Sequence, residues 1–190
     1  MPRWQPPAFS KTFFSVIGCL EESRVQYGLI GAMALGVWGT SRATQDVDCL
    51  VMSGEKEQAV LMANLRRRRF VLDARWADRN PALREWCVRY RQGLFPVDLL
   101  SPRDEYDHEA LRRRRRKRID KRPVWVVGPE DLILLKLKAG RPRDFEDAIS
   151  VVLRQGGKLD VEYMKNWAKR LGLWEEVMYC LTQSKAPMQG

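Results

Sequence analysis

Apolar and polar positions repeat along this chain with two different periods, and the pattern changes at residue 129. Before that point, short apolar runs typical of strands alternate with segments whose apolar residues have helical spacing. The strand-like runs cover 25–30, 46–52, 70–76, 85–92, 95–101 and 123–127. Helical spacing predicts helices over 10–22, 31–39, 55–68 and 105–118.

From residue 129 onward the pattern is almost wholly helical. Pro129 stands in the first turn of a predicted helix that stops at Gly140. Two further helical segments, 141–157 and 160–173, are each closed by glycine. We therefore expect an α+β protein, with a mixed sheet and flanking helices over 1–128 and a helical part over 129–190 packed on this core.

The composition is that of an ordinary globular chain, but the charge is not. Of the 190 residues, 45% are hydrophobic and 31% are charged, which is enough to build a sound core. The formal net charge is +10, much of it in the basic runs 66–69 and 112–118. Such runs attract phosphates without reading base sequence, although a solvated helix face is the plainer interpretation of either run alone.

Cysteine usage and the absence of apolar spans indicate the compartment. Cys19, Cys49, Cys87 and Cys180 are scattered, without the paired spacing of a zinc site or a disulfide framework. No apolar run approaches the ~20 residues that cross a bilayer, and the first residues lack the pattern of a secretory signal. We expect a cytoplasmic protein with no membrane partner.

Two aspartates inside an otherwise apolar strand are the main chemical signal. Side chains at i and i+2 of a strand share a face, so Asp46 and Asp48 project together and repel each other unless a cation intervenes. Oxygen ligands suit Mg²⁺ or Mn²⁺. The alternative is a carboxylate pair at an exposed strand end. Asp98, in the middle of a later apolar strand, would also need a partner, and the same metal site could supply it.

A phosphate-binding turn is predicted upstream of these aspartates. Gly31 and Ala32 stand where a strand gives way to a helix, so a phosphate could approach backbone N–H groups there. Between this turn and Asp46, hydroxyl and guanidinium groups suited to phosphate oxygens come from Thr40, Ser41, Arg42 and Thr44. Three carboxylates beside a phosphate-binding turn suit two-metal phosphoryl chemistry.

The combined pattern resembles the nucleotidyltransferase superfamily, which has the polymerase-beta-like fold. Its signature is a glycine turn, a spacer and an Asp-x-Asp pair, and the chain has Gly31-Ala32, a spacer of 13 residues, and Asp46-Val47-Asp48. Ala32 departs from the serine or second glycine that is usual there. The resemblance implies catalytic and metal-binding roles for Asp46, Asp48 and Asp98.

A closer resemblance is to nucleotidyltransferases related to the AbiEii-type toxins of toxin–antitoxin and defence systems. It rests on the glycine turn, on "VDLL" around Asp98, and on the helical segment "PEDLILLKLKAGRPRDFED". The resemblance implies nucleotide-binding roles for Lys136 and Arg141, with Asp144 orienting one of them. Taken alone, these residues would be read as a surface salt bridge.

The resulting hypothesis is a magnesium-dependent enzyme that moves a nucleotide from an NTP to an acceptor hydroxyl. Asp98 would complete a second metal site beside the acceptor. The acceptor is expected to be RNA, such as a tRNA end, with a cognate toxin or antitoxin protein as a further partner. Two alternatives stay open: an antibiotic nucleotidyltransferase, whose acidic acceptor pocket could come from residues 104–109, and a non-catalytic protein that binds nucleotide, RNA or a partner.

The basic run 112–118 carries the RNA prediction. As part of a helix over 105–118, consecutive cations would surround the helix and could not all be buried. We expect Arg113, Arg114 and Arg116 to form a phosphate-tracking surface beside the active site.

Overall fold

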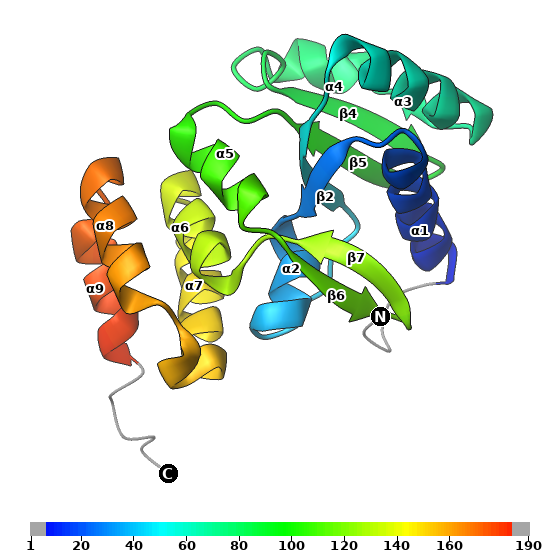
Figure 1. Ribbon diagram of the computed structural model, residues 1–190. Coiled ribbons are helices and arrows are strands. Elements are labelled where there is room, and N and C mark those ends of the chain that lie inside the picture. The colour runs from blue at the N-terminus through cyan, green and yellow to red at the C-terminus, as the bar shows by residue number, and fades with distance from the viewer. Residues whose placement is uncertain (1–6, 184–190) are drawn as a thin grey trace.

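The computed structural model of the protein describes residues 7–183. Within these residues the strands are β1 (Gln26–Leu29), β2 (Val47–Met52), β3 (Val71–Leu72), β4 (Cys87–Gln92), β5 (Phe95–Leu100), β6 (Arg115–Ile119) and β7 (Arg122–Val126). They form one mixed sheet in the order β3-β4-β5-β2-β1-β7-β6, which Figure 1 shows crossing the middle of the molecule. This is the α+β fold that the sequence predicts.

Two parallel pairs lie in the centre of this sheet. β2 runs parallel to β5, and β1 runs parallel to β7, whereas β1–β2, β3–β4, β4–β5 and β6–β7 are antiparallel. Parallel strands need long crossover connections, so residues far apart in sequence meet in the centre. The β2–β5 register places Asp48 directly opposite Asp98.

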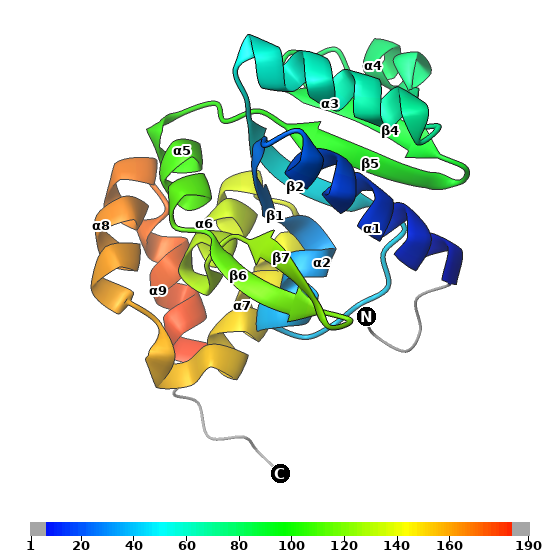
Figure 2. The ribbon, with the colours of Figure 1, turned by 45° about the vertical axis from the view of Figure 1, so that its right-hand side comes forward.

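Helices cover both faces of the sheet. Those before residue 129 are α1 (Pro7–Glu22), α2 (Gly31–Trp38), α3 (Glu55–Arg67), α4 (Ala74–Arg79) and α5 (Glu105–Arg112). Those after it are α6 (Pro129–Ala139), α7 (Pro142–Gln155), α8 (Val161–Leu171) and α9 (Trp174–Gln183), with a short 3₁₀ turn, η1 (Gly156–Lys158). Figure 2 shows α1 and α3 over one side of β2, β4 and β5, with α6–α9 gathered at the other end of the molecule. No helix between residues 7 and 183 is both long and apolar enough to cross a membrane.

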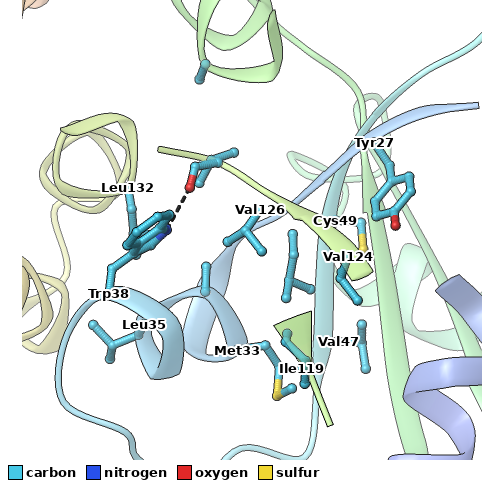
Figure 3. Packing of buried hydrophobic residues seen from close by; sticks show 14 of the residues in the cluster. Tyr27, Met33, Leu35, Trp38, Val47, Cys49, Ile119, Val124, Val126 and Leu132 are labelled. Carbon is cyan, nitrogen blue, oxygen red and sulfur yellow. Dashed lines mark hydrogen bonds between the residues drawn. The ribbon is translucent and has the colours of Figure 1, made fainter. Parts of the chain in front are cut away.

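One continuous cluster of buried apolar side chains joins the sheet to the C-terminal helices. Figure 3 shows how α2 contributes: Leu35 and Trp38 lie near Val126 of β7 and Leu132 of α6. The indole Nε1 of Trp38 donates a hydrogen bond to the carbonyl oxygen of Val127 at 2.8 Å. This contact ties the end of α2 to the segment that follows β7. The division of the chain at residue 129 stays a prediction.

Most elements lie where the pattern predicts them, and α6, α7 and α8 match best, whereas α9 was not predicted as a separate helix. α6 spans the residues expected, and Gly140 ends it in the left-handed region at φ +68°. The strand predicted over 70–76 is wrong beyond Leu72. The Asp73 carboxylate accepts a hydrogen bond from the backbone N–H of Trp76 and caps α4, so the chain turns into a helix there.

The helix predicted over 105–118 is also wrong in its second half. α5 ends at Arg112, and from Arg115 onward the basic run forms the edge strand β6, which pairs with β7 in a hairpin. Asp120 and Lys121 make its turn with positive φ values of 46° and 67°. Pairing with β7 makes this segment a strand, and the local sequence does not reveal that pairing.

Candidate active site

A row of charged side chains crosses one face of the sheet. The register places Arg89 of β4 opposite Asp98 of β5, and Asp98 opposite Asp48 of β2. Asp46 precedes Asp48 by two positions and therefore shares its face. Three carboxylates from two parallel strands thus gather at one place, as the sequence predicts.

Gly31 closes the row on the side of β1. The backbone N–H of Ile30 donates to the carbonyl oxygen of Asp48 at 3.0 Å, so the start of α2 lies against β2. Gly31 has φ +62°, and a Cβ added to it would lie 2.0 Å from Oδ2 of Asp48. Only glycine fits, because the backbone conformation and the contact both exclude a side chain. The first N–H groups of α2, including that of Ala32, therefore border the carboxylates.

Burial and mutual repulsion disfavour the ionised carboxylates. Desolvation is the main cause that raises the pKa of Asp48 to about 6, and the negative charges of Asp98 and Asp46 add to it. Desolvation also raises the pKa of Asp46, and the negative charge of Asp98 adds to it against the opposing effect of Arg89. A bound cation would relieve both effects.

Asp98 already has a cationic partner. Nε and Nη2 of Arg89 donate to its Oδ1 and Oδ2, each at 2.6 Å. The guanidinium carbon of Arg89 also lies 4.6 Å from the centre of the Trp76 ring of α4. The hydrogen bonds to Asp98 raise the pKa of Arg89 further, so the guanidinium stays charged.

A second charged cluster joins α6, α7 and the segment before β2. Nζ of Lys136 donates to Oδ1 of Asp144 at 2.8 Å and to Oδ2 of Asp147 at 2.7 Å, and all three side chains are buried. Arg42 makes a forked contact with Asp147, with Nε–Oδ1 and Nη2–Oδ2 both at 3.1 Å. Arg141 donates through Nε to Oδ2 of Asp144 at 2.7 Å.

The cations of this cluster differ in their exposure to solvent. Burial disfavours the Asp144 carboxylate, but hydrogen bonds from Lys136 and Arg141 outweigh that effect and lower its pKa. The side chain of Arg141 is 76% exposed, whereas that of Lys136 is 8% exposed. Arg141 is thus placed to meet a ligand, and Lys136 holds two helices together.

A cavity of about 430 Å³ brings the row and the cluster together. Of the predicted site residues, its lining includes Asp46, Asp48, Asp98, Gly31, Ala32, Arg42, Thr44, Lys136, Arg141 and Asp144. Ser41 is exposed and does not line the cavity. The hydroxyl of Thr44 also has a local partner, since it accepts a hydrogen bond from the backbone N–H of Asp46 at 3.2 Å.

The lining also contains residues that the sequence pattern did not single out. Trp86, Arg89, Arg103, Lys138 and Arg143 lie in the same cavity. A signal for Arg89 existed in the sequence: Gly93 marks a hairpin, and counting outward from its turn pairs Arg89 with Asp98. The rim residues follow from the folded arrangement and carry no comparable signal.

The donor set fits one divalent cation better than two. Asp46 and Asp48 offer adjacent oxygen ligands whose charges need compensation. Both oxygens of Asp98 are engaged by Arg89. Across residues 7–183, no group of three or more acidic, histidine or cysteine side chains is arranged to hold a metal ion.

The basic run lies elsewhere, and its arginines have partners within the chain. Arg113 pairs with the fully buried Asp131 through Nε–Oδ2 at 3.4 Å, and its guanidinium lies 3.6 Å from the centre of the Tyr163 ring. The guanidinium of Arg114 lies 4.8 Å from the Trp125 ring centre. Arg116 pairs with Glu21 at 3.7 Å. None of these three arginines lines the cavity.

The carboxylates of β2 and β5 lie beside the Gly31 turn, as the resemblance to nucleotidyltransferases implies. The comparison with protein families agrees: residues 10–178 match the family described as "Nucleotidyl transferase of unknown function (DUF2204)". The chain belongs to this family and is an enzyme of the nucleotidyltransferase superfamily. The narrower resemblance to AbiEii-type proteins is not confirmed. A search of curated protein sequences gives no match.

Solved structures share the fold at low sequence identity. The solution structure of the antibiotic-resistance factor ANT(2'')-Ia is 13% identical, with a TM-score of 0.64, over 92% of this chain and 99% of that one. An antigenic nucleotidyltransferase-like protein from Paracoccidioides brasiliensis is 18% identical, with a TM-score of 0.54, over 90% and 93%. The lincomycin-bound lincosamide antibiotic adenylyltransferase LnuA is 11% identical, with a TM-score of 0.53, over 74% and 94%.

Proposed function

We propose that the protein transfers a nucleoside monophosphate from an NTP to an acceptor hydroxyl, with Mg²⁺ or Mn²⁺ as cofactor. The observation that carries this proposal is the order of groups across the sheet. The Gly31 turn, the pair Asp46 and Asp48, and then Asp98 follow one another from β1 to β5 in one cavity. This order matches the parts of the reaction, with pyrophosphate at one end and the acceptor at the other.

The Gly31 end suits the phosphates of the nucleotide. The N–H groups of the first turn of α2 are suited to bind an anion, and Arg42 and Arg141 bring positive charge to the same cavity. A metal ion held by Asp46 and Asp48 would neutralise the triphosphate and stabilise the leaving pyrophosphate. Lys136 supports this end by holding Asp144 of α7 in place, and Asp144 in turn accepts a hydrogen bond from Arg141.

The Asp98 end suits the acceptor. A hydroxyl that enters beside β5 lies on the far side of Asp46 and Asp48 from the Gly31 turn, as in-line attack requires. Asp98 accepts a hydrogen bond from this hydroxyl. The hydroxyl oxygen forms a bond to the α-phosphorus, the bond to the bridging oxygen breaks, pyrophosphate departs with that electron pair, and the proton passes to solvent.

The charge around the cavity favours an anionic acceptor over a cationic antibiotic. The acidic segment 104–109 could have received an aminoglycoside, but its carboxylates are engaged. Nζ of Lys138 lies 2.6 Å from both Asp104 Oδ2 and Asp107 Oδ1. Glu105 pairs with Arg170 at 2.6 Å, and Glu109 pairs with Arg112 at 2.5 Å.

RNA fits the rim of the cavity. The Arg103 side chain is 44% exposed, and its guanidinium carbon lies 4.3 Å from the centre of the Trp86 ring. Arg143 is exposed at the same cavity. Cations and an aromatic ring together suit a phosphate backbone and a base at its end. We therefore propose an RNA acceptor and a role in a toxin–antitoxin or defence system, in a cytoplasm whose reducing conditions suit buried free cysteines.

The decisive experiment offers each labelled NTP, with Mg²⁺, to the purified protein together with total RNA, total protein or an aminoglycoside. We expect label in RNA, and none with the variant Asp46→Asn/Asp48→Asn. Transfer by that double variant would contradict the assigned site. Label in protein or antibiotic would overturn the RNA acceptor but keep the enzyme class.

A matched pair of variants locates the RNA contacts. Arg103→Gln/Arg143→Gln removes cations at the cavity rim, whereas Arg113→Gln/Arg114→Gln/Arg116→Gln removes cations of the basic run that the sequence first suggested. We expect the rim variant to weaken RNA binding and flatten its salt dependence more than the run variant does. A larger effect of the run variant would instead place the RNA-binding surface on the basic run 112–118.

Ala32 departs from the superfamily signature at the glycine turn. This residue replaces the serine or glycine that the superfamily usually carries, and it removes a hydroxyl from the phosphate turn. Nucleotide binding without any transferred label, in the same assay, would contradict the proposed transfer.

A further inference from the structure

Arg89 occupies the part of the site where a second metal ion would be expected. Two-metal phosphoryl-transfer sites place two cations about 3.5–4 Å apart, bridged by shared carboxylates. Here the third carboxylate, Asp98, faces a guanidinium that binds both of its oxygens at 2.6 Å. Two parallel N–H···O bonds of this kind are the strongest geometry an arginine can make.

The backbone also brings the pair together. Arg89 and Asp98 are direct cross-strand partners in the antiparallel β4–β5 hairpin, so the register holds their side chains next to each other. The Trp76 ring contacts the guanidinium from α4. The two side chains are only 16% and 10% exposed. This degree of enclosure is unlike that of a surface ion pair.

The charges balance with one divalent cation. Asp46, Asp48 and Asp98 carry three negative charges when ionised, and Arg89 compensates one of them. The two that remain match a single Mg²⁺ or Mn²⁺ at Asp46 and Asp48. A second divalent ion at Asp98 would meet the positive charge of Arg89 at close range.

We propose that the guanidinium of Arg89 takes the place of the second divalent cation, so that this enzyme works with one metal ion held by Asp46 and Asp48. This inference rests on the proposed function and adds a residue to it. The hydrogen bonds to Asp98 use only part of the donor set of a guanidinium, and Arg89 lines the cavity. Its other N–H groups can donate to the phosphoryl oxygens or the acceptor.

The number of bound metal ions tests the proposal directly. The full-length protein is mixed with one equivalent of an α,β-methylene NTP and titrated with Mn²⁺, which is followed by electron paramagnetic resonance. We expect one Mn²⁺ per protein–nucleotide complex, with the spectrum of an isolated ion. Two ions per complex with a spin-coupled spectrum would overturn the proposal and leave the proposed function intact. Loss of all Mn²⁺ binding would contradict the proposed function itself.

Substitutions at the pair sharpen the test. Arg89→Gln should release Asp98 and admit a second Mn²⁺ with a spin-coupled spectrum, whereas Arg89→Lys keeps a cation and should keep one ion. The double variant Arg89→Gln/Asp98→Asn should again bind one Mn²⁺. Asp98→Asn alone should not change the wild-type number, and a loss of one ion there would contradict the proposal.

A matched control comes from the same strand. Arg91 also stands on β4 and pairs with Asp73, outside the cavity lining. Arg91→Gln should leave the Mn²⁺ number at one. If Arg89→Gln does not fold, the wild-type and Asp98→Asn numbers still decide the question.

Discussion

Gly31 and Gly93 have almost the same φ in very different surroundings. Their φ values are +62° and +63°, but a Cβ at Gly93 would meet nothing within 4 Å, whereas one at Gly31 would lie 2.0 Å from an oxygen of Asp48. The hairpin glycine therefore serves only the turn. The glycine of the site also allows the helix to approach the carboxylate.

Alanine substitutions at these two glycines separate strain from contact. Gly93→Ala should lower the free energy of unfolding by about 1 kcal/mol, the cost of the left-handed conformation alone. Gly31→Ala should cost about 3 kcal/mol, since the clash with Asp48 is added. Urea unfolding of both variants measures the difference, and equal costs would contradict the close approach of Gly31 to Asp48.

Asp131 is a residue whose protonation the fold controls. It is fully buried at the start of α6, and this burial raises its pKa to about 6 despite hydrogen bonds from Tyr163 and Arg113. An acid with a raised pKa binds its proton more tightly in the folded state, so its contribution to stability is present at low pH and is lost as pH rises through 6.

The variant Asp131→Asn should therefore flatten part of the pH dependence of stability. Between about pH 4 and about pH 6, the wild type should lose about 2 kcal/mol of unfolding free energy relative to the variant. Urea titrations at several pH values provide the measurement. Asp78→Asn, at an exposed position of α4, is the control and should follow the wild type.

At the scale of elements, α6 and α7 are joined by a buried cation. Lys136→Met would leave Asp144 and Asp147 without their shared partner, which should lower the free energy of unfolding by about 3 kcal/mol. Arg141→Gln removes an exposed partner of Asp144 and should cost less than about 0.5 kcal/mol. Equal stability of these two variants in urea would contradict the structural role of Lys136.

Arg141 should matter more for nucleotide binding than for stability. If this residue meets the triphosphate, Arg141→Gln weakens NTP binding while the protein stays as stable as the wild type. Unchanged NTP affinity in isothermal titration would reduce Arg141 to a surface ion pair.

The sequence predicted those elements whose signals are local. The helix from Pro129 to Gly140 carries its own start and stop, and the Gly93 turn fixes a hairpin. The helix predicted to continue to residue 118 was wrong, because pairing with β7 outweighs the helical composition of the basic run. The strand predicted around Asp73 was wrong because a single capping hydrogen bond to the Asp73 carboxylate starts α4 there.

The same distinction applies to the site. Spacing alone brings Asp46 and Asp48 to one face, and the structure places Asp98 beside them. Arg89 was missed because its importance depends on sheet register, and Trp86 was missed because it joins the cavity only in the folded chain. The arginines of the run at 112–118 have carboxylate and aromatic partners within the chain that the sequence does not reveal. Their role in RNA binding stays a prediction.

The whole molecule keeps its cysteines out of solvent. All four are free and buried, and burial raises the pKa of Cys19 and of Cys180 to about 11 and that of Cys87 to about 12. Because the thiolate is the reactive form, the native protein should react negligibly with a thiol reagent such as DTNB. Four thiols should react after unfolding in urea. Rapid modification of one thiol in the native state would reveal local opening around it.

The strand order also governs how the chain folds. The hairpins β4–β5 and β6–β7 join neighbouring segments, whereas the parallel pairs β2–β5 and β1–β7 join strands from distant parts of the chain. Contacts of high sequence separation form slowly, because closing a long loop costs entropy before the contact contributes. We expect the hairpins to form early and the central parallel pairs to form in the last step. A partly folded chain, on or off the ribosome, would therefore hold Asp48 and Asp98 apart and could not consume nucleotide.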